Sequence, residues 1–175
     1  MHMYLGQEYQ ILDWFYIHFT ENNGMAFGFE FGGAWGKLAL SIFRIVFVGF
    51  LVSYLLKLIR KNADHILITC MSLILAGAMG NIIDGVFYGV LFSDSYHQLA
   101  TFLPESGGYA PLFFGRVVDM FYFPMFKGYL PDWLPFFGGD YFVFFRPVFN
   151  VADAAISIGV GLMILFQGRV MKALD

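Results

Sequence analysis

Three long apolar runs constrain this chain more than any other feature of its sequence. A helix that crosses a bilayer takes about 20 mostly apolar residues, and the runs at residues 38–56, 66–83 and 149–167 approach that length. Arg44 is the only charge in the first run, the second run has none, and Asp153 is the only charge in the third. Only 13% of the chain is charged, against about 25% in soluble domains, so a soluble fold could not bury this much apolar surface.

The predicted fold is therefore an all-α polytopic membrane protein, with one membrane domain over residues 1–175 and three transmembrane helices. Basic residues set its orientation, because cytoplasmic flanks are rich in Lys and Arg. They follow the first and the last run as Lys57, Arg60, Lys61, Arg169 and Lys172. Residues 1–37 and 84–148 then lie together on the outer side of the membrane.

The two outer segments are rich in aromatic residues, glycine and proline. Alternating stretches at residues 14–19 and 26–31 predict short strands, and hence a small β-rich outer segment. Residues 113–126 predict an amphipathic element at the membrane interface. Glycine and proline punctuate the rest of the long loop, which argues against a further long helix there.

The orientation places the amino terminus outside, yet residues 1–10 contain neither a basic region nor an apolar region that would export them. Either the first span pulls this short tail across the membrane, or a further transmembrane helix precedes it. We favour the second explanation.

Several classes of function lack their sequence signals. The net charge of −3 comes without a cluster of basic residues, so we expect no nucleic-acid partner. Cys70 is the single cysteine and is expected to be a small buried hydrophobe. No zinc-protease, serine-hydrolase or P-loop motif occurs in the sequence.

Acidic residues at membrane depth are the strongest functional signal, since a carboxylate there is costly and usually has a partner. Asp84, Asp119 and Asp153 fall at predicted outer span ends or in the outer loop. Asn81 precedes Asp84 by three residues, and Asn150 precedes Asp153 by three, so on a helix each amide shares a face with its acid. The sequence therefore predicts a cluster of acids and amides at the outer face.

Two carboxylates with different protonation states are the machinery of an aspartic protease. Asp153, in the first turn of its predicted helix, would be stabilised as an anion by the helix dipole. Apolar neighbours would raise the pKa of Asp119. The alternative is a non-enzymatic small membrane subunit, or a transporter component whose acids bind an ion or relay protons. A relay needs acids spread through the membrane, whereas these cluster at one face.

Four short motifs resemble those of bacterial lipoprotein signal peptidases, the signal peptidase II family of aspartyl peptidases. In chain order they are Asn22-Asn23-Gly24-Met25-Ala26-Phe27, Gly80-Asn81-Ile82-Ile83-Asp84, Val117-Val118-Asp119-Met120 and Phe149-Asn150-Val151-Ala152-Asp153. The resemblance implies Asp119 and Asp153 as the catalytic pair. It also implies a supporting or substrate-binding set: Asn22, Gly24, Asn81, Asp84, Asn150 and Ala152.

The same resemblance implies hydrolysis of the peptide bond before a diacylglyceryl-modified cysteine in a prolipoprotein. The reaction would take place at the outer face of the bacterial cytoplasmic (inner) membrane, with no metal or organic cofactor and with membrane lipids as the other partner. The implied fold has four transmembrane helices, an extracytoplasmic β-rich cradle and a lid-like interfacial helix, and we expect a monomer. Which aspartate is the base and which the acid stays open.

The chain also departs from the family pattern. Gly85 stands where the family usually has arginine, and Arg116 is a candidate substitute. The Asp-Gln-x-x-Lys motif of the family's first helix is absent, and the interval between Asp84 and Asp119 is longer than usual. An inactive fragment of such a peptidase is therefore a third possibility.

Overall fold

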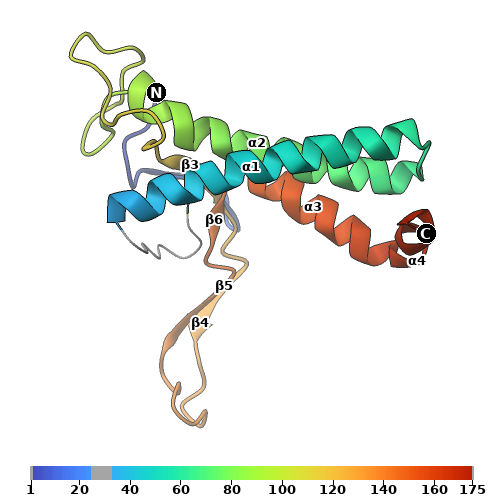
Figure 1. The fold of residues 1–175 in the computed structure, drawn as a ribbon. Coiled ribbons are helices and arrows are strands. Elements are labelled where there is room, and N and C mark those ends of the chain that lie inside the picture. Colours follow the sequence, from blue (N-terminus) through green and yellow to red (C-terminus); the bar gives the residue numbers. More distant parts are fainter. Residues whose placement is uncertain (1, 25–32, 175) are drawn as a thin grey trace.

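The computed structural model describes residues 2–24 and 33–174, in which long helices carry a small sheet near one end (Figure 1). The helices are α1 (Gly33–Arg60), α2 (His65–Leu91), α3 (Val151–Leu165) and α4 (Gln167–Leu174). All three predicted spans fall on helices. Both α1 and α2 are long and apolar enough to cross a membrane, whereas α3 reaches that length only together with α4, from which it is bent by 86°.

Two helix boundaries differ from the prediction. Helix α1 begins at Gly33, ahead of the predicted start, and α2 runs on through Asp84 to Leu91, into the segment expected to be outer loop. A single glycine such as Gly85 costs a helix only about 1 kcal/mol, so the apolar residues that follow it keep the helix going. The helix ends where Phe92 turns extended, at φ −125° and ψ 150°.

Helices α2 and α3 pack closely because small residues line their contact. A Cβ atom on Gly77 would collide with the backbone oxygen of Ala152, and one on Gly80 would lie 3.1 Å from the Cβ of Ala152. Further along, a Cβ on Gly159 would lie 2.9 Å from the backbone oxygen of Cys70. Small residues of this kind let membrane helices approach each other closely. Ala152, one of the predicted site residues, is thus also a contact between helices.

Much of α1 presents large apolar side chains outward, as expected of a surface that faces lipid. Phe43, Val46 and Phe50 are each more than 60% exposed. A small buried cluster joins α1, α2 and α4 at the end remote from the sheet, and its members are Leu51, Leu58, Leu67, Met71 and Val170.

The sheet has four antiparallel strands in the order β1-β2-β3-β6, and two further strands, β4 and β5, form a separate hairpin. The strands are β1 (Glu8–Leu12), β2 (Phe15–Asn22), β3 (Val117–Tyr122), β4 (Phe126–Tyr129), β5 (Tyr141–Phe144) and β6 (Val148–Phe149). Thr20 of β2 pairs with Asp119 of β3, and Phe121 of β3 pairs with Phe149 of β6. The sheet therefore brings together segments about 100 residues apart in the sequence.

Residues 113–126, predicted as an amphipathic element, contain strand β3 and no helix, so the interfacial helix that the resemblance implies does not lie there. The structure describes every residue of 92–150, and none of them is helical. β-branched and aromatic residues in β3 favour a strand, β2 and β6 supply partners on both sides, and Pro124 follows at its end. The strand predicted at residues 14–19 corresponds to β2, whereas the one predicted at 26–31 lies outside the described residues.

Candidate active site

The pairing of β2 with β3 places Asn22 beside Asp119. The Nδ2 atom of Asn22 donates a hydrogen bond to Oδ2 of Asp119, whose side chain is buried at 5% exposure. The backbone N–H of Gly24, at a φ of +83°, donates in turn to Oδ1 of Asn22. A backbone turn that suits glycine therefore fixes which way the Asn22 amide points, and so presents its N–H group to the acid.

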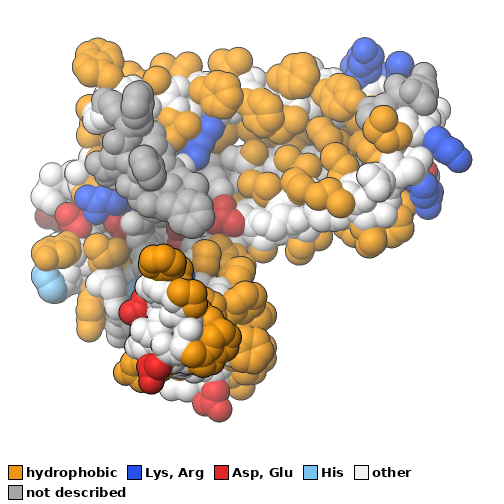
Figure 2. All heavy atoms as spheres, turned by 90° about the horizontal axis from the view of Figure 1, so that it is seen from below, with side chains coloured by type: hydrophobic (Ala, Val, Ile, Leu, Met, Phe, Trp, Pro, Cys, Tyr) orange, Lys and Arg blue, Asp and Glu red, His pale blue; other side chains and the backbone are white. Residues whose placement is uncertain are grey.

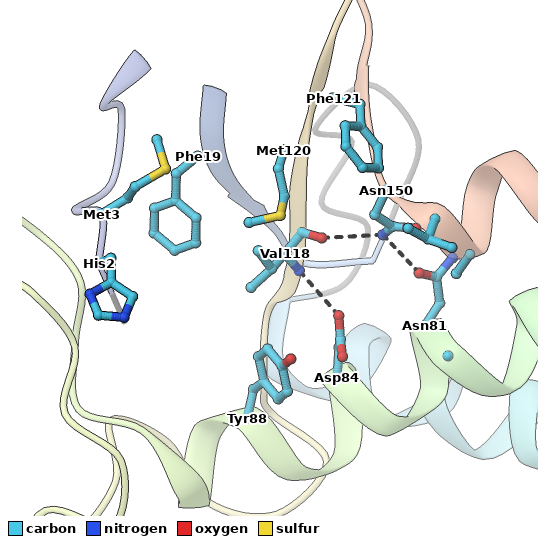
Figure 3. Close-up of a pocket in the computed structure, with 13 residues that line it drawn as sticks. His2, Met3, Phe19, Asn81, Asp84, Tyr88, Val118, Met120, Phe121 and Asn150 are labelled. Atoms are coloured by element: carbon cyan, nitrogen blue, oxygen red, sulfur yellow. Dashed lines mark hydrogen bonds between the residues drawn. The ribbon is translucent and has the colours of Figure 1, made fainter. Parts of the chain in front are cut away.

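Asn150, just before α3, connects this acid to helix α2. Its Nδ2 atom lies 2.9 Å from Oδ1 of Asp119, 3.0 Å from Oδ1 of Asn81 and 3.2 Å from the backbone oxygen of Val118. Figure 3 shows Asn150 meeting Asn81 and the Val118 backbone at one point. Asn150 is buried, so these acceptors replace water as its partners.

Asp153 belongs to the same network. Its Oδ1 accepts a hydrogen bond of 2.9 Å from Nδ2 of Asn81. Asn150 and Asp153 also form a capping box, in which the Asn150 side chain accepts from the Asp153 backbone N–H and the Asp153 side chain accepts from that of Asn150. Three amides, Asn22, Asn81 and Asn150, therefore hold both carboxyl groups in place.

Asp84 lies on the other side of strand β3. Its Oδ2 accepts from the backbone N–H of Val118 at 3.4 Å, as drawn in Figure 3. It lines a cavity of about 480 Å³ with the apolar side chains of Phe19 and Met120. Asp84 thus ties β3 to α2, and its charge also acts on Asp119.

Asp119 and Asp153 both line a larger cavity of about 840 Å³. Burial raises the pKa of Asp119 to about 6; the charge of Asp153 adds to this rise, and the hydrogen bonds from Asn22 and Asn150 oppose it. A carboxyl group whose pKa lies this close to neutrality can exchange a proton under physiological conditions.

Two arginines that the sequence analysis left out of the site line the same cavity. Arg44, the single charge inside the first apolar run, donates from Nη2 to the backbone oxygen of Gly24 and interacts electrostatically with Asp153. Arg146, before β6, lines the cavity as well. An isolated charge in an apolar span was the available signal for Arg44.

Arg116, the candidate substitute for the missing cation, points elsewhere. Its Nη1 lies 3.0 Å from Oε2 of Glu21 and 3.8 Å from Oδ1 of Asp94, and its guanidinium sits 5.0 Å from the ring centre of Tyr109. Burial alone would lower the pKa of Arg116, but the hydrogen bond and charge of Glu21, with Asp94, leave it raised. Arg116 therefore anchors the loop before β3 and does not line the cavity that holds the two acids.

Comparison with known proteins decides the family. The sequence profile of signal peptidase (SPase) II matches residues 1–168. The chain belongs to the signal peptidase II family. Its relatives include two proteins named lipoprotein signal peptidase. That of Porphyromonas gingivalis is 55% identical over 98% of this chain and 75% of its own length, and that of Amoebophilus asiaticus is 40% identical over 92% and 64%.

Solved structures agree with the family at the level of the fold. A bacterial membrane enzyme superposes with a TM-score of 0.57 at 25% identity, covering 94% of this chain and 77% of the other. A second bacterial membrane enzyme gives 0.54 at 24% identity. The chain is therefore a membrane-embedded peptidase of the signal peptidase II family.

Proposed function

We propose that this peptidase removes signal peptides from diacylglyceryl-modified prolipoproteins, with Asp119 and Asp153 as a catalytic pair that activates water. The observation that carries the proposal is the amide network, in which Asn22, Asn81 and Asn150 direct N–H groups at both carboxyl groups beside one cavity. Fixed donors around a reacting pair reduce the reorganisation that the reaction needs.

The two acids take different roles in this proposal. Asp119 carries the shared proton, because burial raises its pKa to about 6. Asp153 serves as the carboxylate base, since it lies in the first turn of α3, accepts from Asn81 and interacts with the charge of Arg44. Unequal environments of this kind are what separates acid from base in a carboxyl pair.

The reaction then follows in two steps. Asp153 takes a proton from water as the water oxygen bonds to the carbonyl carbon, and Asp119 gives its proton to the carbonyl oxygen, which leaves a tetrahedral diol. Asp153 next passes its proton to the amide nitrogen while the C–N bond breaks, and Asp119 recovers its proton as the new carboxyl group forms. The products are the signal peptide and a lipid-modified cysteine with a free amino group.

The distribution of basic residues supports a site at the outer face of the cytoplasmic membrane. Lys57, Arg60, Lys61 and Lys172 lie at the end of the helices remote from the sheet, which by the positive-inside rule is cytoplasmic. The substrate's acyl chains could then stay in the outer leaflet while its peptide bond reaches the two acids.

The test is cleavage of a diacylglyceryl-modified prolipoprotein by the protein in nanodiscs. We expect Asp119→Asn and Asp153→Asn each to abolish cleavage, and Asp132→Asn, which removes an exposed carboxylate in the β4–β5 hairpin, to leave it unchanged. Substantial cleavage by either site variant would contradict the two-acid mechanism. If the unmodified prolipoprotein were cleaved equally well, the proposed substrate class would be wrong.

A further inference from the structure

The β4–β5 hairpin exposes many large apolar side chains outside the helices. Residues 125–146 contain nine aromatic side chains among 22 residues. Trp133 is 78% exposed and Phe136 is 97% exposed at the turn, and Phe126 is 71% exposed on β4. A two-stranded hairpin by itself is at best marginally stable in water, so a surface like this one needs a partner.

The hairpin has two unlike faces, because residues paired across antiparallel strands lie on the same face. Phe126 pairs with Phe144 and Gly128 with Phe142, so one face carries only phenylalanine side chains. The other face is mixed, with Lys127 paired with Val143 and Tyr129 paired with Tyr141. Lys127 turns this face toward the main sheet, since its Nζ lies 4.6 Å from the ring centre of Tyr16. The phenylalanine face is left open.

The direction of the hairpin indicates what covers that face. In Figure 1 it leaves the molecule near the start of α3 and extends across the direction of the long helices, away from them. Helices that cross a bilayer run along the membrane normal, so the hairpin runs along the membrane surface at the level of the two acids. In Figure 2 hydrophobic side chains gather on the side of the hairpin nearer the far ends of the helices, while acidic side chains lie along its left and lower edges.

The charge of the hairpin identifies the kind of surface. Lys127 and Arg146 balance Asp132 and Asp140, so residues 125–146 carry no net charge and would gain little from anionic headgroups. Exposed Trp, Tyr and Phe are instead typical of the boundary between lipid headgroups and acyl chains. This composition favours a neutral lipid interface over a charged partner.

We propose that the β4–β5 hairpin is a membrane-interface arm, which lies along the outer leaflet with its Phe126, Phe142 and Phe144 face in lipid. The arm continues into Arg146 and Phe149, which line the cavity of the two acids. Its contact with lipid therefore fixes that cavity at the depth of the headgroups. The inference depends on the orientation of the helices and not on the catalytic roles of the acids.

The test compares two neighbouring positions on opposite faces. In a background with Trp14, Trp35 and Trp133 changed to Phe, single tryptophans are introduced as Phe142→Trp and Val143→Trp. Each variant is placed as one copy per nanodisc of neutral phosphatidylcholine. Quenching of its fluorescence is then measured with brominated acyl chains and with aqueous iodide, at low and high salt. Thermal unfolding like that of the parent confirms that each variant folds.

We expect position 142 to be quenched several-fold more by brominated lipid than position 143, with bromine near the headgroups most effective and with no effect of salt. Iodide should act mainly on position 143. Strong iodide quenching at both positions would overturn the proposal, because the hairpin would then stand in water. Equal lipid quenching at both would overturn the assigned face. Lipid contact that appears only with two copies per disc would make the hairpin an interface between copies and likewise refute the proposal.

Discussion

Asn150 is the residue at which stability and catalysis can be separated most sharply. Its side-chain oxygen caps α3 by accepting from the backbone N–H of Asp153, and its Nδ2 donates to Oδ1 of Asp119. Serine caps a helix about as well as asparagine does but offers no N–H group to the acid. Asn150→Ser should therefore keep the cap and lose the donor, whereas Asn150→Ala should lose both.

The expected magnitudes follow from these contacts. A hydrogen bond to a charged group contributes about 1.5–3 kcal/mol, and an N-cap about 1 kcal/mol. Asn150→Ala should then destabilise the protein by about 2.5–4 kcal/mol, and Asn150→Ser by about 1 kcal/mol less. If the lost donor acts in the transition state, kcat should fall about 10- to 100-fold in both variants.

The pH profile gives an independent readout. The hydrogen bond from Asn150 lowers the pKa of Asp119 against the larger effect of burial, so its removal should raise that pKa above about 6. Because Asp119 acts in its protonated form in the proposed mechanism, the loss of activity at high pH should move to higher pH in Asn150→Ser.

The assays are prolipoprotein cleavage in nanodiscs across pH and thermal unfolding of the same samples. Asp64→Ala is the matched control, because Asp64 caps α2 at the opposite end of the molecule by accepting from the Ile66 N–H at 2.8 Å. It should lower thermal stability without changing kcat. If Asn150→Ser kept the parent kcat and pH profile, Asn150 would be a cap only, and the role assigned to its N–H group would be refuted.

Three further changes test other parts of the structure. As pH rises from about 4 through about 6, the parent should lose up to about 3 kcal/mol of stability relative to Asp119→Asn, because the buried acid with its raised pKa ionises only in the parent. Thermal unfolding of both proteins across pH measures this, and a stability difference that did not change with pH would contradict it. Arg44→Gln should lower kcat about 10-fold, since it removes the guanidinium that donates to the Gly24 carbonyl and the charge near Asp153. A kcat equal to that of the parent would show that Arg44 does not assist the reaction. Gly77→Ala should lower the free energy of unfolding by about 1–3 kcal/mol, because its new methyl group collides with α3. Gly85→Ala is the control, since a methyl group there meets no atom within 4 Å and should not destabilise the protein. Equal thermal stability of the two variants would be inconsistent with this packing.

The positions of the helices could be predicted because each apolar run is a local signal. The ends of the helices could not be predicted as well, because the apolar pattern continues past Asp84 and α2 runs on to Leu91. The sheet was harder still, because β3 is stabilised by β2, whose residues lie about 100 positions earlier, and β6 has only two residues. A strand whose partners are so distant gives little local signal, so residues 113–126 could be predicted only as an amphipathic element and not as part of a sheet.

In the candidate site, too, local contacts could be predicted from the sequence and contacts between distant segments could not. Asn81 with Asp84, and Asn150 with Asp153, are spaced for one helix face, so a grouping of amides and acids could be expected from sequence. The contact between Arg44 and the Gly24 carbonyl could not be expected from sequence, because it depends on how α1 packs against the segment that follows β2. The arginines that line the cavity of the two acids are Arg44 of α1 and Arg146, whereas Arg116 contacts Glu21 and Asp94.

This arrangement explains why a cation is useful at that point of the chain. Two carboxyl groups line one cavity, and the charge of Asp153 disfavours ionisation of Asp119. A guanidinium that interacts with Asp153 while bonded to the Gly24 carbonyl puts a positive charge near that acid and also holds the turn that orients Asn22 toward Asp119. In the proposed mechanism, one side chain from α1 therefore acts on both acids, which links the packing of the first span to the chemistry of the pair.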